Sequence, residues 1–129
     1  MAVTNQIDEA TTTTAAAMTQ TTIDAGSPLY VHPSDSPGSS LVPLPFDGIG
    51  YRSWRKSVLR ALSVKNKIGF ITGDTEKPIV NSPLFRQWER CDDMVTSWIL
   101  NSLSKDIADS VEYVNDSVEL WKELQDRYN

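Results

Sequence analysis

The chain has 129 residues, 40% of them apolar, with 17 acidic and 12 basic side chains and a formal net charge of −5. This length allows one domain at most. One cysteine and one histidine exclude an internal disulfide framework and a Cys/His zinc site. No signal peptide is recognisable, and no apolar run approaches the ~18 residues of a membrane span, so we expect a soluble protein of the cytoplasm, with the nucleus as the alternative compartment.

The first 46 residues differ in composition from the remainder. Residues 1–27 are rich in Thr and Ala and show no apolar period, which predicts a disordered tail. Residues 28–46 contain five prolines, which exclude a helix and favour an extended arm. The arm is too apolar for a free linker, and we expect parts of it to dock on the following domain through Leu29, Tyr30, Val31, Leu41, Val42, Leu44 and Phe46.

Apolar residues at helical spacing predict a first helix over residues 49–65, which Asn66 and Gly69 terminate. One face of this helix carries Trp54, Val58, Ala61, Leu62 and Lys65. Beside that face lies a basic stripe in which a cation repeats every four positions, at Arg52, Lys56 and Arg60. Arg55 widens this stripe.

The charges are separated along the chain. Residues 48–73 hold six basic side chains and no acidic one, whereas residues 74–129 hold six basic and twelve acidic side chains, a net charge of −6. A cluster of cations on one helix is a candidate surface for the phosphates of a nucleic acid. The residues that would form it are Arg52, Arg55, Lys56, Arg60, Lys65 and Lys67.

A loop over residues 72–83 precedes a longer helix. Ser82 is a favourable N-cap for it and Pro83 a favourable first residue. Its apolar face extends for about five turns and comprises Leu84, Trp88, Cys91, Val95, Trp98, Ile99 and Ser102.

Two further helices complete the pattern. Ser104 is expected to cap a short helix with Ile107, Val111 and Val114 on its apolar face. A last helix begins at Asn115 or Asp116, because Asp116 and Glu119 have capping-box spacing, and it is expected to bury Val118, Trp121, Leu124 and Tyr128. About four helices without a usable strand pattern predict an all-α domain over residues 47–129.

No combination of residues predicts catalysis. His32 lies in the arm, where no helix or strand would fix it as a general base, and Cys91 lies on an apolar face, where burial suppresses the thiolate. Asp92 and Asp93 are adjacent on a helix and point about 100° apart, so they cannot converge on one ion. We therefore expect no enzyme, cofactor, metal or small-molecule substrate.

The four tryptophans and the basic stripe each allow two interpretations. Trp54, Trp88, Trp98 and Trp121 all fall on apolar faces, which favours core packing over a base-stacking platform. The basic helix could bind phosphates, or it could pair with the acidic C-terminal half, within one molecule or between neighbours. We favour charge pairing.

Several spaced motifs resemble one protein family. HPSDSPG at residues 32–38, FDGIGYRSW at residues 46–54 and KNKIGFITG at residues 65–73 are similar to the N-terminal Gag segment of plant copia-type LTR retrotransposons. WERCDDMVTSWILNS at residues 88–102 and ELWKELQDRY at residues 119–128 resemble later helices of that family, in the same order.

The resemblance implies a non-enzymatic Gag protein with a capsid-like helical domain that assembles into a particle around the RNA of the element. Its partners would be itself or other Gag chains, with weak binding of element RNA as the alternative, and no membrane. Members of the family continue into further capsid helices and a zinc knuckle, so we expect the domain over residues 47–129 to be incomplete at its C-terminus.

Overall fold

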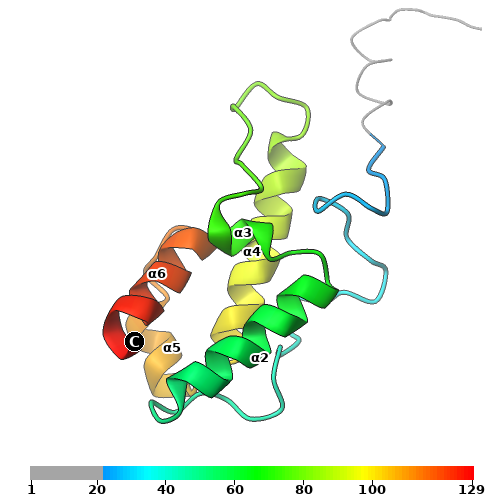
Figure 1. The fold of residues 1–129 in the computed structure, drawn as a ribbon. Helices are drawn as coiled ribbons and strands as arrows, with labels where there is room; N and C mark the ends of the chain where they lie inside the picture. Colours follow the sequence, from blue (N-terminus) through cyan, green and yellow to red (C-terminus); the bar gives the residue numbers. More distant parts are fainter. Residues whose placement is uncertain (1–21) are drawn as a thin grey trace, which may run out of the picture.

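The computed structural model describes residues 22–129, and these residues form an all-α domain, as predicted (Figure 1). Its helices are α2 (Tyr51–Val64), α3 (Gly69–Thr72), α4 (Phe85–Asn101), α5 (Lys105–Val111) and α6 (Ser117–Tyr128). Among the described residues the only β-type pairing is an isolated parallel bridge between Phe46 and Leu103. Residues 1–21 of the predicted disordered tail lie outside the described part of the chain.

Helix α2 ends where the sequence predicts, because Asn66 adopts the left-handed conformation with φ 59°. The amide of Asn66 bonds to the carbonyl of Ser63 at 3.0 Å, and the amide of Lys67 bonds to the carbonyl of Leu62 at 2.8 Å. These two bonds form a Schellman motif, which satisfies the last carbonyls of the helix. The motif turns the chain sharply away from the axis of α2.

Within residues 22–129 there is one helix more than the expected four, because α3 occupies residues that the sequence pattern leaves unassigned. The helix has a single turn, and its Phe70 and Ile71 are buried. The amides of Gly73 and Thr75 both bond to the carbonyl of Gly69. A Cβ atom on Gly69 would collide with the side chain of Thr75, so this close approach requires glycine.

The predicted start of the long helix is wrong by two residues. Helix α4 begins at Phe85, and Ser82 accepts the amide of Leu84 on its hydroxyl at 3.1 Å. Ser82 therefore shapes a turn through Pro83 that leads into the helix, rather than capping it directly. The predicted apolar residues Trp88, Cys91, Val95, Trp98 and Ile99 are all buried. Asp92, which the sequence pattern leaves off this face, is buried as well.

The capping of α6 is confirmed and its predicted buried face is partly wrong. Asp116 accepts the amide of Glu119 at 2.9 Å, and the carboxylate of Glu119 accepts the amide of Asn115 at 3.0 Å. Val118 is 41% exposed, whereas Leu120 is fully buried. Leu120, Trp121 and Leu124 share one face of the helix, and Val118 lies off that face. Val114 lies beyond the end of α5 and is only partly buried.

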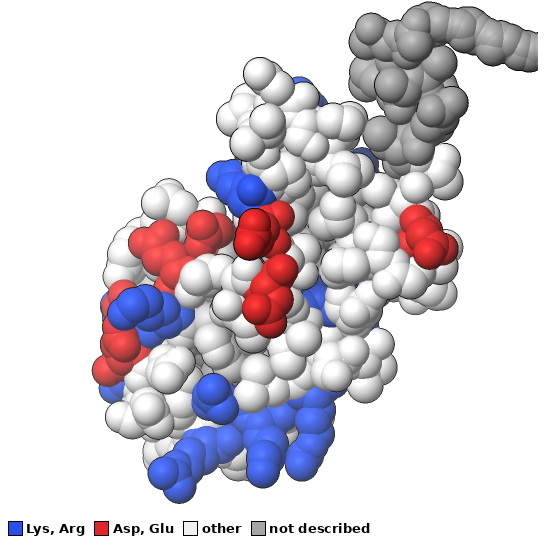
Figure 2. All heavy atoms as spheres, turned by 45° about the horizontal axis from the view of Figure 1, so that its top comes forward, with Lys and Arg blue, Asp and Glu red and all other residues white. Residues whose placement is uncertain are grey.

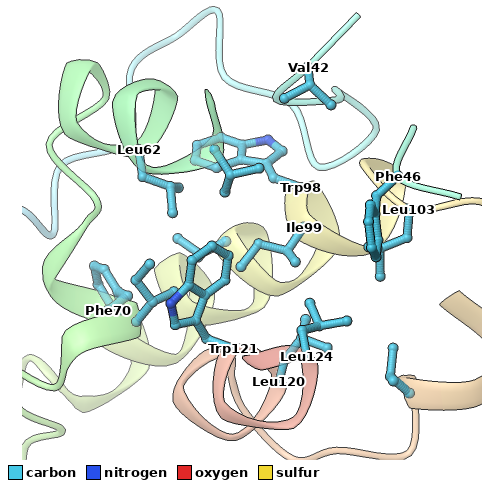
Figure 3. Packing of buried hydrophobic residues seen from close by; sticks show 14 of the residues in the cluster. Val42, Phe46, Leu62, Phe70, Trp98, Ile99, Leu103, Leu120, Trp121 and Leu124 are labelled. Carbon is cyan, nitrogen blue, oxygen red and sulfur yellow. The ribbon is translucent and has the colours of Figure 1, made fainter. Parts of the chain in front are cut away.

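The core lies between α2, α4 and α6, and its aromatic and aliphatic side chains converge from all three helices and from the arm (Figure 3). All four tryptophans are at most 6% exposed, so they pack in the core as predicted. The stacked rings of Trp54 and Trp121 join α2 to α6, with centroids 5.8 Å apart. Truncation of such side chains typically costs about 3–5 kcal/mol.

A buried polar network joins α4, α3 and α6. The hydroxyl of Ser117 lies 2.5 Å from a carboxyl oxygen of Asp92 and 3.0 Å from the carbonyl of Phe70. Ser117 has one hydroxyl proton and cannot donate to both acceptors. A protonated Asp92 can donate to Ser117 while Ser117 donates to Phe70, and the same carboxyl oxygen also accepts the amide of Ser117 at 3.3 Å. The neutral acid fits this network.

Electrostatics also favours the neutral form of Asp92. Burial raises the pKa of Asp92 more than the hydrogen bonds from Ser117 lower it, and Asp116 and Asp93 raise it further. A carboxyl whose folded pKa exceeds its unfolded value of about 3.9 contributes stability that is complete below that value. This stability is lost as the pH rises through the folded pKa.

We predict that Asp92→Asn stabilises the protein at neutral pH, because an amide can bond to Ser117 without carrying charge. The gain in unfolding free energy should be about 1.4 kcal/mol for each unit by which the folded pKa is raised. It should shrink as the pH falls toward 4 in urea denaturation measured across pH. Asp93→Asn is the matched control, since Asp93 is exposed. A loss of stability in Asp92→Asn at neutral pH would contradict the neutral-acid assignment.

Candidate interaction surfaces

The basic face of α2 is an exposed surface formed by Arg52, Arg55, Lys56 and Arg60. Arg52, Lys56 and Arg60 are exposed one turn apart, and Arg55 is half-buried with its guanidinium 5.9 Å from the ring centroid of Trp121. Figure 2 shows Lys and Arg side chains gathered along one edge of the molecule, with acidic side chains on a neighbouring region. Within residues 22–129, none of these four side chains forms an ion pair.

A groove runs between the basic face and the end of α6. It has a volume of about 490 Å³ and is lined by Arg52, Ser53, Arg55, Lys56, Leu59, Gln125 and Asn129. No Asp or Glu is among these residues. The groove therefore places three cationic side chains around one hollow that an anionic chain could enter.

Lys65 and Lys67, the other two candidate residues, do not lie with the basic face. The ammonium of Lys65 is 3.4 Å from the carboxylate of Asp35 and 4.7 Å from the ring centroid of Trp98. Lys67 is 2% exposed and donates to the carbonyl of Tyr30 at 2.6 Å. Burial lowers the pKa of Lys67, although nearby Cys91 and Asp35 act in the opposite direction.

The two lysines therefore hold the arm, residues 22–46, against the helices. The expected docking of the arm occurs, since Leu29, Val42 and Phe46 are buried, but Leu44 is 79% exposed. Docking also begins earlier than the expected boundary at residue 28, because Ile23 packs against the core and Asn66 donates to the carbonyl of Gly26.

Several backbone carbonyls of the arm accept hydrogen bonds from side chains of α4. Gln87 donates to Leu29 at 2.8 Å, and Trp98 donates to Ser36 at 2.6 Å. Asn101 donates to the carbonyl of Pro37 at 2.8 Å. The sequence does not reveal these contacts, because they join residues about 60 positions apart and use the backbone of the arm.

At the end of α4, Ser102 fixes the last part of the arm. Its hydroxyl accepts the amide of Leu41 at 2.9 Å, and its carbonyl accepts the amide of Phe46 at 2.9 Å. The carbonyl of Phe46 in turn accepts the amide of Ser104 at 2.8 Å. This pairing is the parallel bridge between the arm and residue 103.

The candidate catalytic residues are dispersed. His32 is exposed and its Nδ1 lies 2.7 Å from the hydroxyl of Ser34. Cys91 is fully buried, and burial raises the pKa of its thiol. No cluster of three or more His, Cys, Asp or Glu side chains in the described region could hold a metal ion. None of the helices between residues 22 and 129 is both long and apolar enough to cross a membrane.

We predict that Lys65→Met lowers the free energy of unfolding by about 1 kcal/mol, because it removes a partly shielded ion pair and a cation–π contact. Lys56→Met removes the same charge from the exposed basic face and should change stability by less than about 0.5 kcal/mol. Thermal or urea denaturation of the two variants at one pH makes the comparison. Equal losses would show that Lys65 does not anchor the arm.

Comparison with known proteins gives one family. Residues 32–79 match the model of the Gag-polypeptide of LTR copia-type. The matched segment contains most of the arm, α2, α3 and the first part of the following loop. The resemblance inferred from the sequence motifs is confirmed for these residues. No curated protein and no solved structure matches the chain.

Proposed function

We propose that this chain, whose residues 32–79 match the copia-type Gag family, is a non-enzymatic Gag-like structural protein that self-associates. In this proposal, the basic face of α2 of one copy contacts the acidic C-terminal half of another copy. The protein would act in the cytoplasm, with the nucleus as the alternative, and other Gag chains would be equivalent partners.

The observation that carries the proposal is the absence of ion pairs on the basic face within the described chain. Some acidic side chains of the C-terminal half already have a cationic partner within the same helix. Lys105 pairs with Asp109, Lys122 with Asp126 and Arg127 with Glu123. Further acidic side chains, Glu89, Asp93 and Asp106, form no ion pair among residues 22–129. Opposite charges thus remain available on separate regions of one chain.

A single ion pair between exposed side chains is weak. An exposed ion pair contributes roughly 0.2–1 kcal/mol, so several must form together before two copies associate at micromolar concentration. The four cations of the basic face lie on consecutive turns and can act together. Charge pairing also makes the association sensitive to salt, because the Debye length falls from about 10 Å at 0.1 M to about 3 Å at 1 M.

We predict that reversing the exposed cations of α2, with Arg52→Glu, Lys56→Glu and Arg60→Glu together, abolishes self-association. The unaltered chain should show a mass that rises with protein concentration and falls with added salt in light scattering. The matched control reverses three exposed cations elsewhere, Arg86, Arg90 and Lys105, and changes the net charge equally. If both triple variants associate alike, the basic face is not the interface. Circular dichroism verifies that both remain helical.

A second candidate function is sequence-independent binding of RNA, which the groove between α2 and α6 favours. Three cations line the groove and no acidic side chain does. Phosphates bound there would release counterions, so affinity would fall steeply with salt.

We predict that Arg52→Gln with Lys56→Gln weakens binding of single-stranded RNA and makes the slope of log K against log salt shallower by about 0.7 for each phosphate that the protein no longer neutralises. Arg60→Gln is the control, because Arg60 lies on the same helix but does not line the groove. Fluorescence anisotropy with labelled RNA at protein concentrations below self-association makes the measurement. An unchanged affinity in the double variant would exclude the groove.

A further inference from the structure

Helix α5 and its C-cap present three carboxylates to solvent. Asp106, Asp109 and Glu112 are exposed, whereas Ile107 and Val111 of the same segment are buried. At about 100° for each helical residue, the three carboxylates fall within an arc of about 120°. These three residues are called the acidic face of α5.

The carboxylates of this face outnumber the cations beside them. Asp106 and Glu112 form no ion pair within residues 22–129. Asp109 pairs with Lys105, but the side chain of Lys105 is 85% exposed, and such a pair contributes little to stability. Glu112 stands at the C-terminus of α5, where the helix dipole disfavours a negative charge. The stability of α5 therefore does not account for the position of Glu112.

Other exposed carboxylates of the C-terminal half are balanced locally. Glu89 and Asp93 alternate with Arg86 and Arg90 around one hollow on α4, so this surface carries no net charge. The carboxylates of α6 and its N-cap pair with cations of the same helix or bond to amides at its N-terminus. The loop before α4 holds its two carboxylates beside Lys77 and outside any helix. The acidic face of α5 is therefore the stronger counterpart for a cationic surface.

Helix α6 separates the acidic face of α5 from the cationic groove beside α2. Gln125 and Asn129 line the groove from one flank of α6. Arg127 lies about 200° from Gln125 around the helix, and it donates to the hydroxyl and the carbonyl of Ser110 on α5 at 2.9 and 3.2 Å. Helix α5 thus packs on the other flank of α6 (Figure 1). The two charged surfaces lie on opposite flanks and do not pair within one molecule.

Tyr113 follows the acidic face of α5 directly and is 63% exposed. The groove between α2 and α6 offers a matching environment, because it is lined by the apolar Leu59 and by the cations Arg52, Arg55 and Lys56. A tyrosine ring can pack on an aliphatic side chain, attract a cation to its face and keep its hydroxyl in water. Tyrosine is accordingly enriched where protein surfaces meet.

We propose that the acidic face of α5 of one copy docks on the basic face of α2 of another copy, with Tyr113 in the groove. This inference rests on the proposed self-association and names the acidic surface that takes part in it. Charges one turn apart lie about 5–6 Å from each other on both helices, so several ion pairs can form together. Each copy offers one surface to each of two neighbours, and such head-to-tail contacts produce open chains or rings.

Reversal of charge on both surfaces tests the contact directly. The first variant of the full chain reverses the three exposed cations of α2 to Glu, and the second carries Asp106→Lys, Asp109→Lys and Glu112→Lys. We expect each variant alone to stay monomeric in light scattering at concentrations at which the unaltered chain associates. A third variant combines both reversals and should again show a mass that rises with concentration, because its acidic α2 faces a basic α5 of the next copy.

A matched control separates this contact from an effect of net charge. The combined variant has the same net charge as the unaltered chain. The control joins the reversal of α2 to Asp74→Lys, Glu89→Lys and Asp93→Lys, which change exposed carboxylates elsewhere and give that same net charge. The control should remain monomeric, because its α5 is still acidic.

Tyr113→Ala tests the docking without any change of charge. It should weaken association about tenfold, because aromatic residues at the centre of an interface carry a large share of the binding energy. Val64→Ala is the control, since Val64 is 88% exposed and lies outside the groove. Equal association of Tyr113→Ala and the unaltered chain would overturn the placement of Tyr113.

The outcomes distinguish this inference from the proposed function. If reversal of α2 abolishes association and reversal of α5 does not, α5 is not the partner and the proposed self-association stands. Loss in both variants without recovery in the combined variant, or equal recovery in the control, overturns the direct contact. An unaltered chain that stays monomeric, or a reversed α2 that still associates, contradicts the proposed function itself. Circular dichroism verifies the helices of each variant, and Tyr113→Ala keeps the test open if a charge-reversed variant unfolds.

Discussion

The end of α4 at Ser102 is the constraint on which the arrangement of the other elements depends. A helix leaves its last carbonyls without partners, and a buried helix end must find them in other elements. The carbonyl of Ser102 accepts both the amide of Phe46 and the indole of Trp54, each at 2.9 Å. Its hydroxyl donates to Trp98 at 2.8 Å and accepts the amide of Leu41. One fully buried residue therefore positions the arm and α2 relative to α4.

Local sequence patterns predict most of the helical fold, because they determine which faces of α2, α4 and α6 are apolar. Asn66 and the pair Asp116 and Glu119 mark helix ends through bonds that span a few residues. The single turn of α3 is too short to show a period, and its position depends on Ser117, which bonds to the carbonyl of Phe70 across 47 positions of sequence. Periodicity alone also predicts that Val118 is buried, although it is 41% exposed. Leu120 is buried instead, because it packs against helices that are distant in the sequence.

The basic surface could be predicted only in part. Arg52, Lys56 and Arg60 lie on one exposed face because a straight helix converts a spacing of four into proximity. Lys65 and Lys67 lie outside that four-residue repeat, at the Schellman turn that ends α2. Their partners are Asp35 and the carbonyl of Tyr30, at least 30 positions earlier. The six cations therefore divide between a surface and an anchoring role. Helical spacing separates Lys65 from the basic stripe, but the arm partners of Lys65 and Lys67 are too distant in sequence to be predicted.

The proline content of the arm and the way it binds have one physical basis. Proline lacks an amide proton, so an arm with five prolines suits a groove that uses backbone carbonyls. The carbonyls of Leu29, Ser36 and Pro37 all accept hydrogen bonds from side chains of α4. A proline carbonyl can accept such a bond as well as any other, because proline lacks only the amide proton. Prolines also restrict the backbone of an undocked arm, which reduces the entropy lost when it docks.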